Sequence, residues 1–85
     1  MDKPILRLLI QGKVADGRLP RGHIGRRSDG PGNGETCDGC GQPVTAAQMM
    51  MEGLAATGGA VRFHVVCFRV WDVERQIEQR LGARR

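Results

Sequence analysis

Two pairs of potential metal ligands constrain this chain more than any other feature of its sequence. Cys37 and Cys40 form a Cys-x2-Cys pair, and His64 and Cys67 form a His-x2-Cys pair further along the chain. Structural zinc is bound by four nitrogen or sulfur ligands at the corners of a tetrahedron. A Cys-x2-Cys turn brings two thiolates to one side of the ion, and a His-x2-Cys pair in the first turn of a helix presents two ligands on one helical face. The sequence therefore predicts one structural Zn2+ ion, bound by Cys37, Cys40, His64 and Cys67.

Other uses of the cysteines fit the sequence less well. The chain has three cysteines, and an odd number cannot form a closed set of disulfides. A redox-active Cys37–Cys40 pair would need a thioredoxin-like βαβ context and would leave Cys67 without a role. An iron–sulfur cluster prefers four cysteines, and buried structural thiols remain as an alternative. Because four good ligands close the coordination sphere, the zinc is predicted to be structural rather than catalytic. The second histidine, His23, is predicted to be a solvated side chain.

The size and composition of the chain explain why it would need a metal. A chain of 85 residues buries only about 60–65% of the surface that its unfolded form exposes. Thirteen residues are glycine and 4% are aromatic, so the apolar core is small and the entropy of ordering is high. Such domains depend on disulfides, a metal or a partner chain. We therefore expect that residues 37–81 do not fold without metal.

Changes in composition divide the chain into three segments. Residues 1–20 are predicted to contain an amphipathic helix, over about residues 2–17, that ends where glycine and proline follow. Residues 21–36 are rich in glycine and arginine, and we expect a linker with little regular structure. Residues 37–85 are the predicted zinc-binding module.

The module is predicted to consist of a β-hairpin followed by a helix. The arms of the hairpin are residues 48–55 and 60–63, with Thr57-Gly58-Gly59 as the turn. Three consecutive methionines weaken the alternation of the first arm, so a helix is a competing interpretation of residues 48–55. From His64 the apolar spacing becomes helical and continues to about Leu81.

This order of a Cys-x2-Cys knuckle, a β-hairpin and a helix that opens with His-x2-Cys resembles a treble-clef zinc finger. The run Phe63-His64-Val65-Val66-Cys67-Phe68 is similar to part of the first zinc module of LIM domains, although no second set of ligands follows it. The whole layout, with the loop Gly30-Pro31-Gly32-Asn33-Gly34, is also similar to small uncharacterised bacterial proteins. The resemblance implies a small α+β, metal-stabilised domain with an added N-terminal helix. It implies no particular activity or partner.

The predicted C-terminal helix carries a second apolar stripe that the zinc site does not use. This stripe consists of Val66, Val70, Val73, Ile77 and Leu81. The N-terminal helix offers a matching stripe in Ile5, Leu8 and Leu9, so the favoured prediction is that the two helices pack together within one chain. The alternative is that the stripe binds a partner protein or a second copy of the chain as a homodimer.

Charge and motifs narrow the function to two classes of binding. The formal net charge is +4, which permits nucleic acid or acidic partners without requiring them. Acidic residues interleave with the arginines of the predicted helix, and this favours a protein-interaction module of unknown pathway. The alternative is a nucleic-acid-binding zinc finger that uses the arginines of the linker and the helix. We predict no enzyme, because the sequence shows no nucleophile–base pair, carboxylate dyad or phosphate-binding loop.

Hydropathy supports an expectation about location. No apolar run approaches the ~18 residues that a membrane-spanning helix needs. The apolar residues 5–10 include an arginine and are too few for the core of a signal peptide. We expect a cytoplasmic protein.

Overall fold

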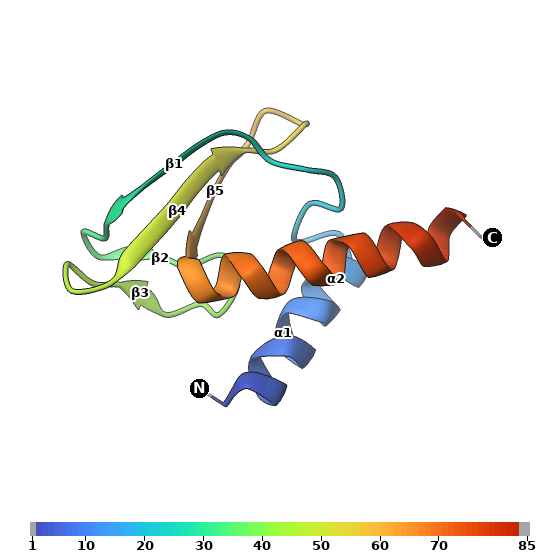
Figure 1. The fold of residues 1–85 in the computed structure, drawn as a ribbon, viewed down its shortest axis with the longest axis horizontal. Helices are drawn as coiled ribbons and strands as arrows, with labels where there is room; N and C mark the ends of the chain where they lie inside the picture. The colour runs from blue at the N-terminus through green and yellow to red at the C-terminus, as the bar shows by residue number, and fades with distance from the viewer. Residues whose placement is uncertain (1, 84–85) are drawn as a thin grey trace.

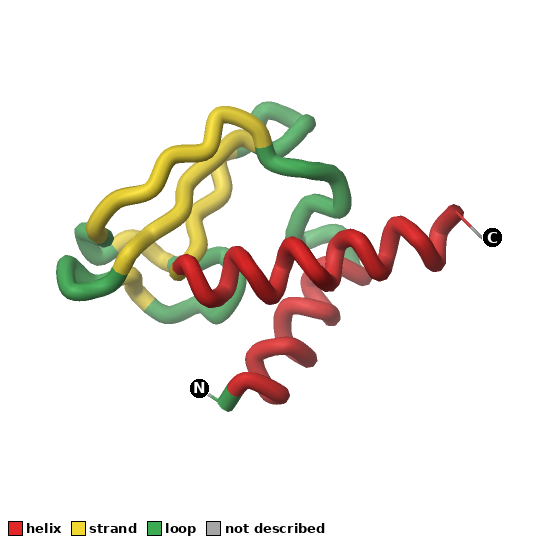
Figure 2. Tube along the Cα trace, viewed as in Figure 1, coloured by secondary structure: helices red, strands yellow, loops and turns green. Residues whose placement is uncertain are grey.

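The computed structural model describes residues 2–83, with side chains up to residue 81. The elements along the chain are α1 (Lys3–Ala15), β1 (Gly25–Pro31), β2 (Glu35–Thr36), β3 (Pro43–Val44), β4 (Met49–Leu54), β5 (Ala60–His64) and α2 (Val65–Ala83). Strands β1, β4 and β5 form one antiparallel sheet with β4 in the middle, and β2 pairs with β3 in a second, two-stranded sheet. Helix α2 starts beside the sheets and extends away from them, crossing α1 (Figure 1; Figure 2). The fold is thus a small α+β arrangement, as predicted.

Helix α1 confirms the predicted N-terminal helix. Asp2 precedes its first residue, and Pro4 lies in the first turn, where its missing N–H interrupts no helical hydrogen bond. The helix ends before Gly17, whose φ of 87° is the left-handed conformation that glycine adopts easily. The backbone N–H of Leu19 then donates to the carbonyl oxygen of Lys13 at 3.0 Å and closes the end of the helix.

The buried face of α1 differs from the predicted one. Leu6, Ile10 and Val14 are buried in the core, whereas Ile5 and Leu8 are exposed. Both sets of residues have helical spacing, so periodicity alone does not select between them. The selection comes from α2, against which α1 packs. The prediction that the two helices pack together within one chain is therefore confirmed, but the predicted stripes are wrong on both helices, because Val66, Val73 and Leu81 of α2 are exposed as well.

The predicted β-hairpin is present as β4 and β5. The two strands pair antiparallel from Met50 opposite His64 to Leu54 opposite Ala60. The competing helical interpretation of residues 48–55 is wrong, because β4 is also paired on its other side. A central strand of this kind satisfies its backbone N–H and C=O groups on both edges.

The expectation that residues 21–36 lack regular structure is wrong. Strand β1 pairs antiparallel with β4, from Gly25 opposite Leu54 to Pro31 opposite Met49. Most side chains of β1 are exposed, so its sequence shows no alternation of apolar and polar residues. Backbone hydrogen bonds to β4 hold the strand in place. Because these bonds do not depend on side-chain type, the sequence pattern does not reveal the strand.

One apolar side chain anchors this segment to the sheet. Ile24 is buried, and it lies so close to Gly53 of β4 that a Cβ at position 53 would overlap its methyl group. Directly after Ile24 the pairing with β4 shifts between Gly25 and Ser28, and Arg26 within this bulge has a φ of 51°. A single isoleucine and one glycine therefore dock a segment whose composition is that of a linker.

Aromatic side chains fill the space between α2 and the sheet. Phe63 and Trp71 are buried with their ring centroids 5.5 Å apart, and Phe68 lies 5.7 Å from Trp71. The indole N–H of Trp71 donates to the carbonyl oxygen of Pro20 at 2.9 Å and ties the chain after α1 to α2. His64 is the last residue of β5, so α2 begins one residue later than the sequence predicted.

Candidate metal centre

The structure brings the two predicted ligand pairs together. Cys37 and Cys40 lie in the loop between β2 and β3, His64 ends β5, and Cys67 lies in the first turn of α2. One ligand atom from each of these residues lies within 4.8 Å of the others. Cys37 and Cys67 are buried, and Cys40 and His64 are half-buried. Four donors from two distant segments of the chain, residues 37–40 and residues 64–67, thus converge at one point near the start of α2.

The loop that carries the first two cysteines is fixed by backbone hydrogen bonds. The N–H of Gly41 donates to the carbonyl oxygen of Cys37 at 2.9 Å. The N–H of His64 donates to the sulfur of Cys37 across 3.4 Å. Asp38 pairs with the edge of β5, where the N–H of Arg62 donates to its carboxylate at 2.7 Å. N–H groups directed at a thiolate reduce the cost of its negative charge.

Gly39 allows this loop to approach the core. A Cβ at this position would lie 3.2 Å from the Cβ of Cys67 and 3.3 Å from the side chains of Ile10 and Phe63. These distances are tighter than ordinary van der Waals contact, and all three neighbours belong to the packed core. The sequence Cys37-Asp38-Gly39-Cys40 therefore needs glycine at its third position for packing.

Contacts of Nε2 with two oxygen atoms orient the imidazole ring of His64. Nδ1 lies 3.4 Å from the sulfur of Cys40 and 3.8 Å from the sulfur of Cys67. Nε2 points away from the sulfurs, 3.2 Å from the carbonyl oxygen of Pro43 and 3.1 Å from Oε1 of Gln48. With Nε2 carrying the proton and donating it to these oxygens, Nδ1 keeps a free lone pair toward the sulfurs. Sequence reasoning missed Gln48 and Pro43, because neither residue type signals such a role.

Hydrogen bonding shifts the pKa values of the Cys37 and Cys67 thiols in opposite directions. The thiol of Cys67 and the backbone N–H groups of Cys40 and His64 lower the pKa of the Cys37 thiol to about 4, against the opposing effect of burial. The same contact with Cys37, together with burial, raises the pKa of Cys67. Without a cation the lowered pKa of Cys37 thus favours its ionisation over that of Cys67, and a divalent ion would favour ionisation of all three thiols.

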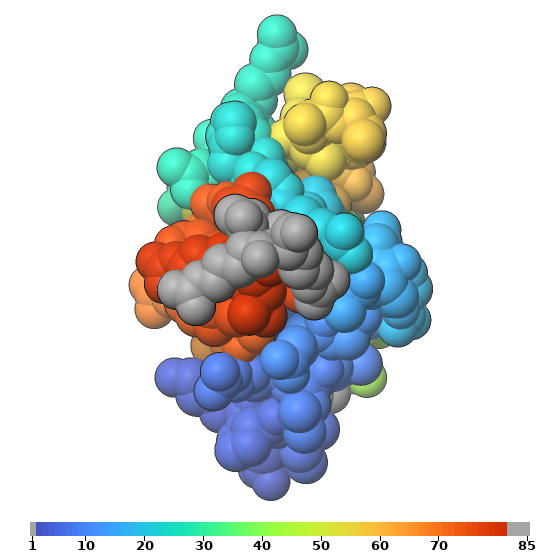
Figure 3. Space-filling model, turned by 90° about the vertical axis from the view of Figure 1, so that its right-hand side faces the viewer, coloured from blue at the N-terminus to red at the C-terminus, as the bar shows by residue number. Residues whose placement is uncertain are grey.

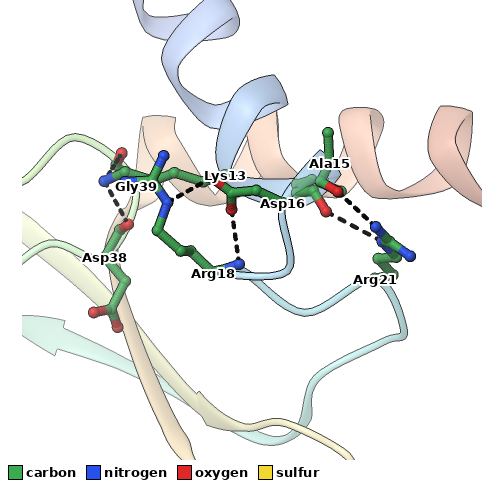
Figure 4. A network of polar contacts seen from close by, with 8 residues as sticks. Lys13, Ala15, Asp16, Arg18, Arg21, Asp38 and Gly39 are labelled. Carbon is green, nitrogen blue, oxygen red and sulfur yellow. Dashed lines mark hydrogen bonds and ion pairs between the residues drawn. The ribbon is translucent and has the colours of Figure 1, made fainter.

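Lys13 connects α1 to the metal-site loop. Its ammonium group donates to the carbonyl oxygens of Asp38 at 3.1 Å and Gly39 at 2.9 Å (Figure 4). Beside it, Arg21 donates to the carbonyl oxygens of Val14 and Ala15 at the end of α1. These contacts were not predicted, since a lysine in the last turn of a helix is also a common solvated residue. The position of α1 and the shape of the loop therefore depend on each other.

The donor set fits a metal ion. Three sulfurs and one imidazole nitrogen, held at mutual distances of no more than 4.8 Å, could hold one ion, and this set is consistent with zinc. Cys37, Cys40 and Cys67 are free thiols, so each sulfur is available as a ligand. His23 is exposed and is not part of the cluster.

Comparisons of the chain with models of protein families, with curated proteins and with solved structures found no match. In the described part of the chain, neither helix is long and apolar enough to cross a membrane.

Proposed function

We propose that the cluster binds one structural zinc ion and that the module acts by binding another protein. The observation that carries the first part is the convergence of three sulfurs and one nitrogen within 4.8 Å. Four protein ligands complete the tetrahedron that zinc prefers and leave no position for a water or a substrate. For this reason we propose a structural ion and no catalytic activity.

The order of the elements supports a treble-clef-like arrangement. A loop with the Cys37 and Cys40 pair precedes the hairpin of β4 and β5, and α2 follows with Cys67 in its first turn. His64 lies at the junction of hairpin and helix. We propose that zinc fastens the loop to this junction, as a knuckle does in a treble-clef finger.

Metal analysis and chelation test the zinc site. Protein produced without added zinc is expected to contain one zinc ion per chain, and its circular dichroism should collapse after exhaustive chelation. Cys40→Ser should lose the metal, whereas His23→Ala, which changes an exposed histidine outside the cluster, should keep it. A metal-free protein with an unchanged spectrum would overturn the proposal.

Exposed apolar side chains support the protein-binding part of the proposal. Leu8 of α1 is 68% exposed, and Val66 and Val73 of α2 are 51% and 55% exposed. Ile5 and Leu81 are also exposed. Val66 and Val73 line one cleft between the helices, and exposed apolar side chains gathered in this way are typical of contact sites for other proteins.

The arginines give less support to the nucleic-acid alternative. Arg7, Arg18, Arg62 and Arg75 each form an ion pair with a carboxylate, which reduces their availability to phosphates. Binding to DNA and RNA, measured at ~50 and ~200 mM salt, distinguishes the two classes, because phosphate contacts produce a steep loss of affinity with salt. Tight, salt-sensitive binding would favour the nucleic-acid function.

Photo-crosslinking in cells that express the full chain tests protein binding directly. A benzophenone side chain is placed at Val73 on α2 or at Arg26 on β1, both of which are exposed. The proposal expects covalent protein adducts at one or both positions. The lack of adducts at both would overturn the protein-binding function.

A further inference from the structure

A cleft lies between the two helices and is lined by residues of both. Its volume is about 380 Å³. It is lined by Lys3, Arg7, Val66, Arg69, Val70, Val73 and Glu74. The two helices contact each other, and Figure 3 shows them side by side as seen from the C-terminal end of α2.

The floor of the cleft is apolar and is formed by one row of α2. Val66, Val70 and Val73 recur at intervals of four and three residues and so share one helical face. The row spans about 10 Å along the helix axis. A second depression, with a volume of about 480 Å³, lies on α1. It shares Lys3 and Arg7 with the cleft, and its lining includes Leu8. The valine row matches the length of about two turns of a further helix, and the basic residues Lys3 and Arg7 separate it from Leu8.

The rim of the cleft is positively charged. Among the described residues that line it, Glu74 is the only carboxylate, and it is 3% exposed and paired with Arg7 at 2.6 Å. This pairing leaves Lys3 and Arg69, both exposed, as charges that face solvent at the two sides of the floor. An apolar floor with a basic rim is complementary to an apolar stripe bordered by carboxylates.

We propose that this cleft binds an amphipathic helix of a partner protein that has acidic residues beside its apolar stripe. The inference rests on the proposed protein-binding function and specifies the partner's chemistry. Anchors at positions i, i+3 or i+4, and i+7 would lie on the valine row, as in other helix-in-groove contacts. A second copy of the chain fits less well, because a twofold interface would place the Lys3 and Arg69 rims of two copies against each other.

A pair of designed peptides tests the charge requirement. One is a fluorescein-labelled, 16-residue helix with leucines on one face and glutamates on the other, and its matched control carries lysines in place of the glutamates. At low salt the zinc-bound protein is expected to bind the glutamate peptide at least about tenfold more tightly. Equal affinities for the two peptides, or no binding of either, would overturn the proposal.

Charge reversal in the protein locates the binding surface. The double variant Lys3→Glu/Arg69→Glu should lose the preference for the glutamate peptide and bind the lysine peptide instead. Both side chains are exposed, so the zinc content and circular dichroism should not change. Arg26→Glu, an exposed position on β1 outside the cleft, is the control and should bind as the parent protein does. An unchanged preference in the double variant would overturn the proposal.

Three further measurements separate this inference from its competitors. Dimers in light scattering that the glutamate peptide fails to dissociate would favour a second copy of the chain. Tighter binding to phosphatidylserine vesicles than to the glutamate peptide would favour a membrane surface. Crosslinked protein adducts at Arg26 but not at Val73 would keep the protein-binding function and overturn the cleft as its site.

Discussion

The two faces of α2 differ in a way that their sequences do not suggest. The face turned to the core carries Cys67, Trp71 and Glu74, all of them buried. A neighbouring face, about a third of a turn away, carries Val66 and Val73, which are about half exposed. The face with the valines is the more uniformly apolar of the two, yet of Val66, Val70 and Val73 one, Val70, packs against the core. In this small domain, hydrophobicity alone does not decide which face of a helix is buried.

The candidate metal centre and the indole explain this choice. Cys67 must face the other three donors, and this requirement fixes the rotation of α2 about its axis. Trp71 follows one turn later on the same side and stacks on Phe63 at 5.5 Å. Glu74 follows after another turn and meets Arg7 of α1. The side chains of Cys67, Trp71 and Glu74, rather than the row of valines, therefore determine which face of α2 turns toward the core.

The largest difference between the faces is expected at two adjacent residues. Cys67→Ala removes one of the four candidate ligands, and because binding of structural zinc contributes on the order of 10–16 kcal/mol in finger peptides, the variant should not fold even with zinc present. Val66→Ala, the matched change on the exposed face, should alter the free energy of unfolding by no more than about 0.5 kcal/mol. Far-UV circular dichroism and zinc content check both. A folded, zinc-containing Cys67→Ala protein would contradict the role given to the metal.

Trp71→Ala tests the aromatic part of the buried face. The loss of a buried tryptophan costs about 3–5 kcal/mol, which is a large part of the stability of a small domain. Trp71→Phe keeps most of the ring packing and loses the hydrogen bond to Pro20, so its cost should be nearer 1 kcal/mol. Urea denaturation of the zinc-bound proteins measures both. Equal losses would mean that the hydrogen bond, rather than the packing, dominates.

Arg7→Ala tests the paired charge. It leaves the buried carboxylate of Glu74 without its partner, and the expected cost is about 1–3 kcal/mol. The control is Arg62→Ala, because the pair between Arg62 and Glu52 is exposed on both sides and should contribute less than about 1 kcal/mol. Comparable losses in urea denaturation would show that burial of Glu74 is unimportant.

Gln48→Ala extends the comparison to a residue outside α2 that supports its metal-binding face. The variant removes the Oε1 atom that lies 3.1 Å from Nε2 of His64. Loss of such a supporting hydrogen bond typically lowers metal affinity 10–100-fold, measured here by competition with a chelating indicator. Gln42→Ala, a nearby exposed glutamine, should leave the affinity unchanged. An affinity equal to that of the parent would assign the support to Pro43 alone.

The sequence predicted those features that need particular residue types, such as the metal donors and the turn of the hairpin. It did not predict features that depend on contacts between distant segments, such as β1 and the buried face of α1. The four donors were visible because thiols and imidazoles at paired spacings have few other uses, and the hairpin was visible from its turn glycines. Strand β1 was missed because its exposed side chains carry no period and its backbone pairs with β4. The buried face of α1 was missed because Ile5 and Ile10 lie on two apolar faces of the helix, and contacts about 60 residues away select one of them.

Val73→Ala tests the exposed face of α2, and its expected effect on stability is the smallest among these variants. Since the side chain is 55% exposed, its truncation should change the free energy of unfolding by no more than about 0.5 kcal/mol. If the exposed face is a contact surface, the same change should weaken binding of the glutamate peptide about threefold to tenfold, because methyl groups that become buried in the complex are lost. The paired measurement of unfolding and peptide affinity separates the two effects. A clear loss of stability with unchanged peptide affinity would mean that Val73 serves the core, and the distinction between the faces of α2 would then disappear.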